Sequence, residues 1–170
     1  MIHQDIIKVG ITHGDINGIG YEVIIKTLLE PHMLEMCTPV IYGSPKVAAY
    51  HRKALNIDNL SFNHVRNVNE ANSKRINIIN CIDDNVRVEL GKSTREAGES
   101  SFNALDAACV DLEQGLIDVL VTAPINKDNI QSEHFNFPGH TEYLAKRFKT
   151  DNYVMLMVSE TMKIGVVTTH

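Results

Sequence analysis

The chain has 170 residues, of which 44% are hydrophobic and 22% are charged, and its formal net charge is −5. This composition is typical of a globular domain with a sizeable core and excludes a low-complexity chain. The negative charge argues against a nucleic-acid partner, which normally requires a basic stripe. No apolar run reaches the roughly 18 residues that span a bilayer, so we expect no membrane partner either.

The cysteines and the start of the chain favour a cytoplasmic location. Cys37, Cys81 and Cys109 are far apart and form no CxxC pair, so we expect reduced thiols rather than a disulfide framework. Asp5 stands where a secretory signal would be basic.

Short β-branched runs alternate with amphipathic stretches along the chain. The expected strands cover residues 6–12, 38–44, 75–80, 117–122, 153–158 and 163–169, and the expected helices cover 21–29, 45–55, 99–115 and 141–148. The clearest is the helix from Glu99 to Gly115, with Ser100 or Ser101 as its cap. Strands interleaved with helices predict an α/β layered fold with a largely parallel sheet.

The end of the chain predicts a fragment. Residues 164–168 read "IGVVT", apolar on both faces, which is typical of an interior strand. Such a strand normally leads into another helix and strand, so we expect its partner strands to be missing. The polar stretch 83–99 predicts a boundary between two lobes, with residues 1–90 in the first and 91–170 in the second.

The first stretch that can carry chemistry is "THGDINGIGYE", residues 12–22, here called the glycine loop. It lies between a strand and a helix, where backbone N–H groups can bind an anion. Its order is G-x-x-x-G-x-G, which is not the dinucleotide fingerprint. A tight turn that needs glycine for its backbone explains the same pattern, and both readings stay open.

Two further motifs follow expected strands or begin an expected helix. In "VTAPINK", Lys127 stands after a strand and can meet a phosphate or carboxylate, although a solvated lysine is the more common case. In "FPGHTEYLA", His140 and Thr141 begin a helix after Gly139, where a ring nitrogen, a hydroxyl and free N–H groups can converge on an anion. Alternatively, Thr141 only caps the helix and His140 is exposed.

The last motif is "TTH", which ends in His170 at the carboxyl end of its strand. Metal sites need three or four ligands, and the sequence contains no HExxH motif or close histidine pair. Any metal bound by His170 must therefore take its other ligands from elsewhere.

Taken together and in order, these motifs closely resemble the N-terminal half of the 4-hydroxythreonine-4-phosphate dehydrogenase family. "GDINGIGYE" matches its G-D-x-x-G-I-G-P-E signature, followed by "AGESSFNALDAA", "TAPINK", "FPGHTEYLA" and "TTH". The family is similar to isocitrate and isopropylmalate dehydrogenases, which implies an α/β/α layered fold of two lobes with a cleft, truncated here. Where many members have proline, this chain has Ile16 and Tyr21, which predicts a less rigid loop.

The resemblance also implies a site. His140 and Thr141 correspond to the substrate-binding pair, and His170 to a ligand of a divalent metal (Zn, Mg, Co or Mn). The other metal histidines, and a Lys, an Asn and an Arg that hold substrate, belong to the C-terminal half. NAD (or NADP) is the expected cofactor, and the active site is shared between the subunits of a homodimer. Catalytic and cofactor-binding residues stay unassigned.

The implied activity is oxidation of the phosphorylated small molecule 4-hydroxythreonine 4-phosphate to 2-amino-3-oxo-4-phosphooxybutanoate, a step of pyridoxal phosphate biosynthesis. We expect the 170-residue chain alone to be inactive. The alternatives are a sister dehydrogenase acting on threonate or erythronate 4-phosphate, a non-catalytic α/β binding domain, and a phosphate acyltransferase of the broader fold.

Overall fold

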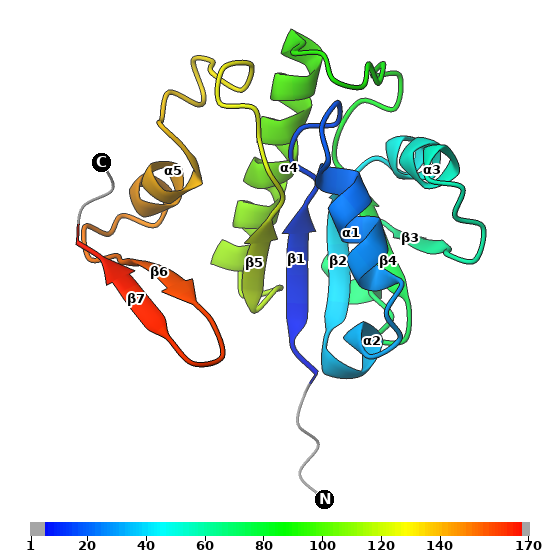
Figure 1. Cartoon of the computed structure of the whole chain (residues 1–170), viewed down its shortest axis with the longest axis horizontal. Coiled ribbons are helices and arrows are strands. Elements are labelled where there is room, and N and C mark those ends of the chain that lie inside the picture. Colours follow the sequence, from blue (N-terminus) through cyan, green and yellow to red (C-terminus); the bar gives the residue numbers. More distant parts are fainter. Residues whose placement is uncertain (1–5, 168–170) are drawn as a thin grey trace, which may run out of the picture. The chain divides into compact units, whose positions relative to one another are not determined.

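The computed structural model describes residues 6–167. The chain divides after Ile130 into two compact units. The first unit is a five-stranded sheet with helices, and all of its neighbouring strands are parallel (Figure 1). The expected α/β class with a largely parallel sheet is therefore confirmed. Residues 91–130 belong to the first unit. The expected division of the full-length protein into lobes near residue 90 stays a prediction.

The first unit has the strand order β3-β4-β2-β1-β5. Three short elements, α2, β3 and η1, are absent from the sequence prediction because they are too short to show a period. The elements in chain order are β1 (Lys8–Thr12), α1 (Gly20–Leu28), α2 (Met33–Met36), β2 (Thr38–Gly43), α3 (Pro45–Ala54), β3 (Phe62–Val65), η1 (Val68–Glu70), β4 (Ile76–Asn80), α4 (Arg95–Glu113) and β5 (Val119–Thr122).

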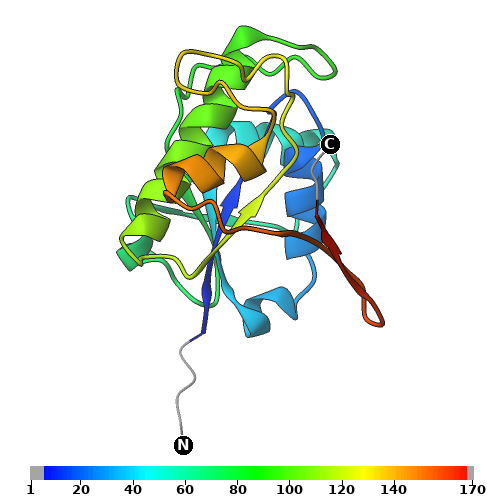
Figure 2. The ribbon, with the colours of Figure 1, turned by 90° about the vertical axis from the view of Figure 1, so that its left-hand side faces the viewer.

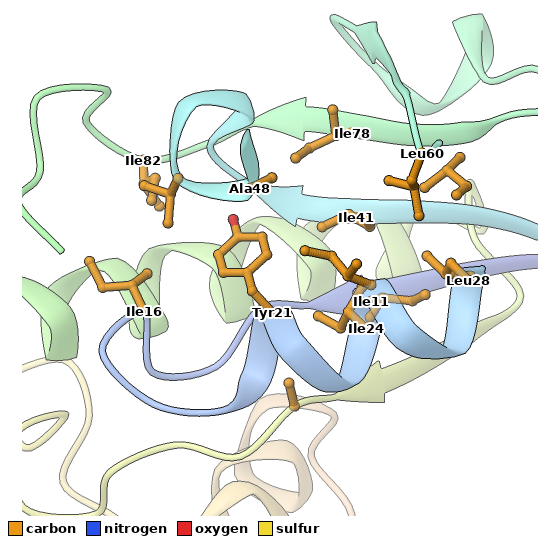
Figure 3. Packing of buried hydrophobic residues seen from close by; sticks show 14 of the residues in the cluster. Ile11, Ile16, Tyr21, Ile24, Leu28, Ile41, Ala48, Leu60, Ile78 and Ile82 are labelled. Atoms are coloured by element: carbon orange, nitrogen blue, oxygen red, sulfur yellow. The ribbon is translucent and has the colours of Figure 1, made fainter. Parts of the chain in front are cut away.

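Helices cover both faces of this sheet. Seen from the side, α4 lies on one face of β1 and α1 on the other (Figure 2). On the α1 face, Ile11 and Ile41 of the central strands pack with Ile24 and Leu28 (Figure 3). Each fully buried side chain of this size contributes about 1.5–3 kcal/mol. This packing fixes the start of α1, and with it the loop that joins β1 to α1.

Helix α4 begins four residues earlier than the sequence predicts. Its cap is Thr94, whose Oγ1 accepts a hydrogen bond from the backbone N of Ala97 at 3.3 Å. The predicted cap at Ser100 or Ser101 is wrong, because the charged residues of the first turn hide its periodicity. The Ser101 hydroxyl instead lies 2.6 Å from the carbonyl oxygen of Gly14 and ties α4 to the glycine loop.

The second unit contains helix α5 (His140–Arg147) and an antiparallel pair, β6 (Met155–Val158) and β7 (Lys163–Val166). Strand β7 forms part of the expected strand 163–169, and its Ile164 is 48% exposed. Because the partner strands are expected to be missing from this chain, an interior place for this strand in the full-length protein stays a prediction. The apolar pattern indicates burial, but β7 pairs only with β6 among the described residues of this unit. In the part of the chain that the structure describes, no helix is long and apolar enough to cross a membrane.

Candidate ligand site at the carboxyl end of the sheet

Two loops leave the same end of the first unit's sheet. Strands β1 and β5 are parallel neighbours, and their carboxyl ends lead into the glycine loop and into residues 123–130 (Figure 1). The connections to the two neighbours of β1 run over opposite faces, through α1 and through α4. The strand order therefore reverses at β1, and open α/β sheets bind ligands at such a point.

Two glycines let the loops approach closely. Gly14 has a φ of +70°, and a Cβ atom built on it would overlap the carbonyl oxygen of Pro124. The next residue, Asp15, donates its backbone N–H to that same oxygen at 2.9 Å. A Cβ atom on Gly20 would overlap the carbonyl oxygen of His13. The turn interpretation of the glycine pattern therefore applies at Gly14, whereas Gly20 is required by close packing at the start of α1.

The glycine loop carries a buried carboxylate. Asp15 is 7% exposed, and its Oδ1 accepts the backbone N–H of Asn17 at 2.8 Å. Its Oδ2 lies 3.4 Å from Nδ2 of Asn129, from the loop after β5. The backbone N–H of Asn17 therefore donates its hydrogen bond to the Asp15 carboxylate and is not available to an anion. This side of the loop is better suited to a hydroxyl or a positive group than to a phosphate.

Two residues of the glycine loop, His13 and Tyr21, form a stack of three rings with His51 of α3. The rings of His13 and Tyr21 are 5.2 Å apart and nearly parallel, at 6°, and the ring of His51 lies 5.1 Å from Tyr21 on its other side. The Tyr21 hydroxyl accepts the backbone N–H of Ser44 at 3.1 Å, and Nε2 of His51 lies 2.8 Å from the carbonyl oxygen of Ile16. Packing and hydrogen bonds at Ile16 and Tyr21 therefore hold the loop where the sequence predicts less rigidity.

Burial keeps both histidines of this stack neutral. It lowers the pKa of His13 to about 4 and also lowers the pKa of His51. The carbonyls of Gly14 and Ser100 favour the protonated His13 ring, but neither ring nitrogen makes a hydrogen bond of standard geometry. The same burial raises the pKa of the Tyr21 hydroxyl. The stack therefore carries no charge at neutral pH.

The side chain of Asn126 stabilises the loop after β5. Oδ1 of Asn126 accepts the backbone N–H groups of Asp128 at 3.0 Å and of Asn129 at 3.3 Å, which closes a tight turn. Lys127 is exposed on this turn. The turn places Lys127 on the ligand side of the sheet, where its proposed contact with an anion stays a prediction.

In the second unit, α5 begins at His140, and Gly139 in the capping position provides no side-chain hydrogen bond. Thr141 lies inside the first turn, so the alternative that Thr141 caps the helix is wrong. Both His140 and Thr141 are half-buried. Backbone N–H groups at such a start have no acceptor within the helix and favour an anion.

An aromatic cluster holds α5 within its unit. The Tyr143 ring is buried and lies 5.2 Å from Phe135 and 5.6 Å from Phe137. Phe135 and Phe137 precede the Gly139 turn, so the same contacts fix the approach to the helix. The "FPGHTEYLA" motif is thereby one packed substructure.

The candidate site residues predicted from the sequence do not all lie in one unit of the structure. The glycine loop and Lys127 lie in the first unit, at one end of its sheet. His140 and Thr141 lie in the second unit, and His170 lies outside the described residues. Within residues 6–167, no three His, Cys, Asp or Glu side chains cluster as metal ligands. The described residues alone therefore do not supply a complete set of metal ligands.

A groove of about 500 Å³ in the first unit is unsuited to a phosphate. It lies between the segment after β4 and the first turns of α4, and Asp83, Glu89, Glu96 and Glu99 line it beside Arg87. Lys92 pairs with Glu89 and Arg95 pairs with Glu99, so the four carboxylates stand beside three cations and keep a small excess of negative charge, which disfavours an anion.

Comparison with known proteins identifies a family and named relatives. The model of one family, described as pyridoxal phosphate biosynthetic protein PdxA, matches residues 35–170. A 4-hydroxythreonine-4-phosphate dehydrogenase from Bacteroides thetaiotaomicron is 52% identical over 170 residues, covering 99% of this chain and 46% of the relative. A protein from Oceanobacillus iheyensis named "Putative D-threonate 4-phosphate dehydrogenase" is 33% identical, covering 95% of this chain and 49% of the relative.

A solved structure shares the fold. The crystal structure of a 4-hydroxythreonine-4-phosphate dehydrogenase from Burkholderia phymatum matches with a TM-score of 0.85 and 28% identity, over 97% of this chain and 50% of that one. The chain therefore spans about half the length of the relatives that it matches.

Proposed function

Because this chain belongs to the PdxA family of pyridoxal phosphate biosynthetic proteins, we propose that the full-length protein oxidises 4-hydroxythreonine 4-phosphate with NAD or NADP. The observation that carries this is the family match over residues 35–170, which includes the His140–Thr141 motif and His170. The product would be 2-amino-3-oxo-4-phosphooxybutanoate, in the biosynthesis of pyridoxal phosphate.

In this proposal, His140 and Thr141 hold the phosphorylated substrate. The start of α5 brings together the ring of His140, the hydroxyl of Thr141 and backbone N–H groups, and hydrogen bonds from such donors to an anion are strong. The nicotinamide cofactor takes the hydride from the secondary alcohol. A divalent metal would polarise that hydroxyl when bound, and this chain would contribute His170 to it, with the other ligands from beyond these 170 residues.

Replacing His140 tests the substrate role. A lost charge-assisted hydrogen bond costs about 1.5–3 kcal/mol, so His140→Ala in the full-length enzyme should raise KM about ten- to a hundredfold. Metal content by elemental analysis should stay normal, whereas His170→Ala should lose metal. Lys146→Ala, in the last turn of α5, serves as the control and should leave KM unchanged.

Thr141 gives a second arm of this test. Since Thr141 is not the helix cap, Thr141→Ala removes a hydroxyl contact without a capping loss, and Thr141→Ser should behave as wild type. If His140→Ala loses metal but binds substrate normally, the two histidine roles are reversed.

The relative named for D-threonate 4-phosphate supports one alternative substrate. The two substrates differ in an amino group against a hydroxyl, so the ratio of kcat/KM on 4-hydroxythreonine 4-phosphate and D-threonate 4-phosphate decides between them. A ratio in favour of threonate would replace the substrate and keep the reaction type.

We also propose that the full-length protein is a cytoplasmic homodimer whose active site draws residues from both subunits. Its mass in solution, measured by light scattering, tests the dimer. A monomer with full activity would reject the shared site.

A further inference from the structure

Asn17, in the middle of the glycine loop, is a buried residue whose side-chain hydrogen bonds all reach one distant segment of the chain. It is 3% exposed. Its Oδ1 accepts the backbone N–H of Glu89 at 2.7 Å, and its Nδ2 donates to the carbonyl oxygen of Lys92 and to Oγ1 of Thr94, both at 3.0 Å. Its own carbonyl oxygen accepts the N–H of Gly91 at 2.8 Å. A single residue thus binds four positions of one distant segment.

That segment, residues 89–94, has little else to hold it. It contains no helix or strand, and residues 90–93 are exposed. It leads directly into Thr94, the cap of α4, and Glu89 at its start lines the acidic groove. Since exposed side chains bury little apolar surface, the hydrogen bonds of Asn17 determine where this segment lies.

We propose that Asn17 is a positioning residue of the enzyme: its side-chain amide fixes residues 89–94 against the glycine loop, so that both keep one arrangement on the ligand side of the sheet. The activity part of this inference rests on the proposed function. Asn17 touches neither substrate nor cofactor in this role, and it acts by holding the backbone of residues 89–94 beside the glycine loop.

The variant Asn17→Asp keeps the acceptor of the side chain and removes its donor. It keeps an acceptor for the N–H of Glu89 but places a carboxylate oxygen opposite the carbonyl oxygen of Lys92. The matched control is Asn77→Asp. Asn77 is fully buried, and its Nδ2 lies 2.9–3.0 Å from the carbonyl oxygens of Pro39, Asn72 and Arg75, but it lies near the amino end of β4.

In the full-length protein, Asn17→Asp should speed amide hydrogen exchange in residues 89–94 at least about tenfold, while Asn77→Asp leaves that segment protected. Asn17→Asp should also raise KM for NAD or for the phosphorylated substrate at least about tenfold, and it should change kcat less than about threefold. Asn77→Asp should lower the thermal unfolding midpoint without changing KM.

Unchanged exchange in residues 89–94 would overturn the proposal, as would an Asn17→Asp enzyme that is less stable but has normal KM values. If the wild-type protein turns over neither substrate, the proposed function fails. The exchange comparison then still decides whether Asn17 holds the segment.

Discussion

His13 is a buried imidazole whose two ring nitrogens have no hydrogen-bond partner of standard geometry. Its pKa is about 4 in the folded chain against 6.5 as the ordinary value. Between these values the unfolded chain binds the extra proton, so stability is lost as the pH falls from about 6.5 to about 4. The full loss from this residue is about 3 kcal/mol.

We therefore expect His13→Phe to remove part of the acid sensitivity. Phenylalanine keeps a ring against Tyr21 and cannot be protonated. Urea unfolding between pH 7 and pH 4.5 should show a smaller fall in the free energy of unfolding than in wild type. Equal slopes for His13→Phe and wild type would contradict the assignment.

At this scale, sequence reasoning finds residues that stand in motifs and misses those defined by contacts. The place of His140 at the start of a helix follows from Gly139 and the pattern after it. The role of Asn17 does not, because its partners are more than 70 positions away in the chain. Its only local signal is a polar residue between glycines, which also fits an ordinary turn.

Helix α4 depends on its cap more than a typical helix does. Oγ1 of Thr94 accepts both the N–H of Ala97 and Nδ2 of Asn17. A lost cap costs about 1 kcal/mol, and the partner left behind on Asn17 adds to that cost. We expect Thr94→Ala to lower the free energy of unfolding by about 1–3 kcal/mol, and Thr94→Ser to keep it.

Denaturant unfolding of Asn17→Asp, Thr94→Ala and the double variant checks this. Because the two residues share one hydrogen bond, their losses should not add. Strict additivity would mean that the bond contributes nothing.

Elements are predictable from the sequence where their period is long enough. The five expected elements from residue 38 to residue 122 all exist, although α4 begins earlier and β5 begins later than predicted. Strand β3 is missed because four residues of mixed polarity show no alternation. The antiparallel pairing of β6 and β7 is missed because apolar residues on both faces indicate a buried strand, whether or not neighbours are present.

At the scale of the whole molecule, the proposed chemistry needs more than these 170 residues. The described residues supply no set of three metal ligands, and the relatives are about twice as long. We expect the purified 170-residue chain to form no NADH from 4-hydroxythreonine 4-phosphate, measured by absorbance with the full-length protein as the positive control. Clear turnover by the short chain would show that it contains a complete site.

The position of β1 between β2 and β5 also sets a time order for synthesis. Its register joins Val9 to Pro39 on one side and to Val119 on the other. A ribosome adds about 5–20 residues per second, so the second partner is made roughly 5–20 s after the first strand. During that interval the nascent sheet has an open edge at β1, next to the glycine loop. Chaperone occupancy on the nascent chain should therefore be highest before residue 122 has left the ribosome.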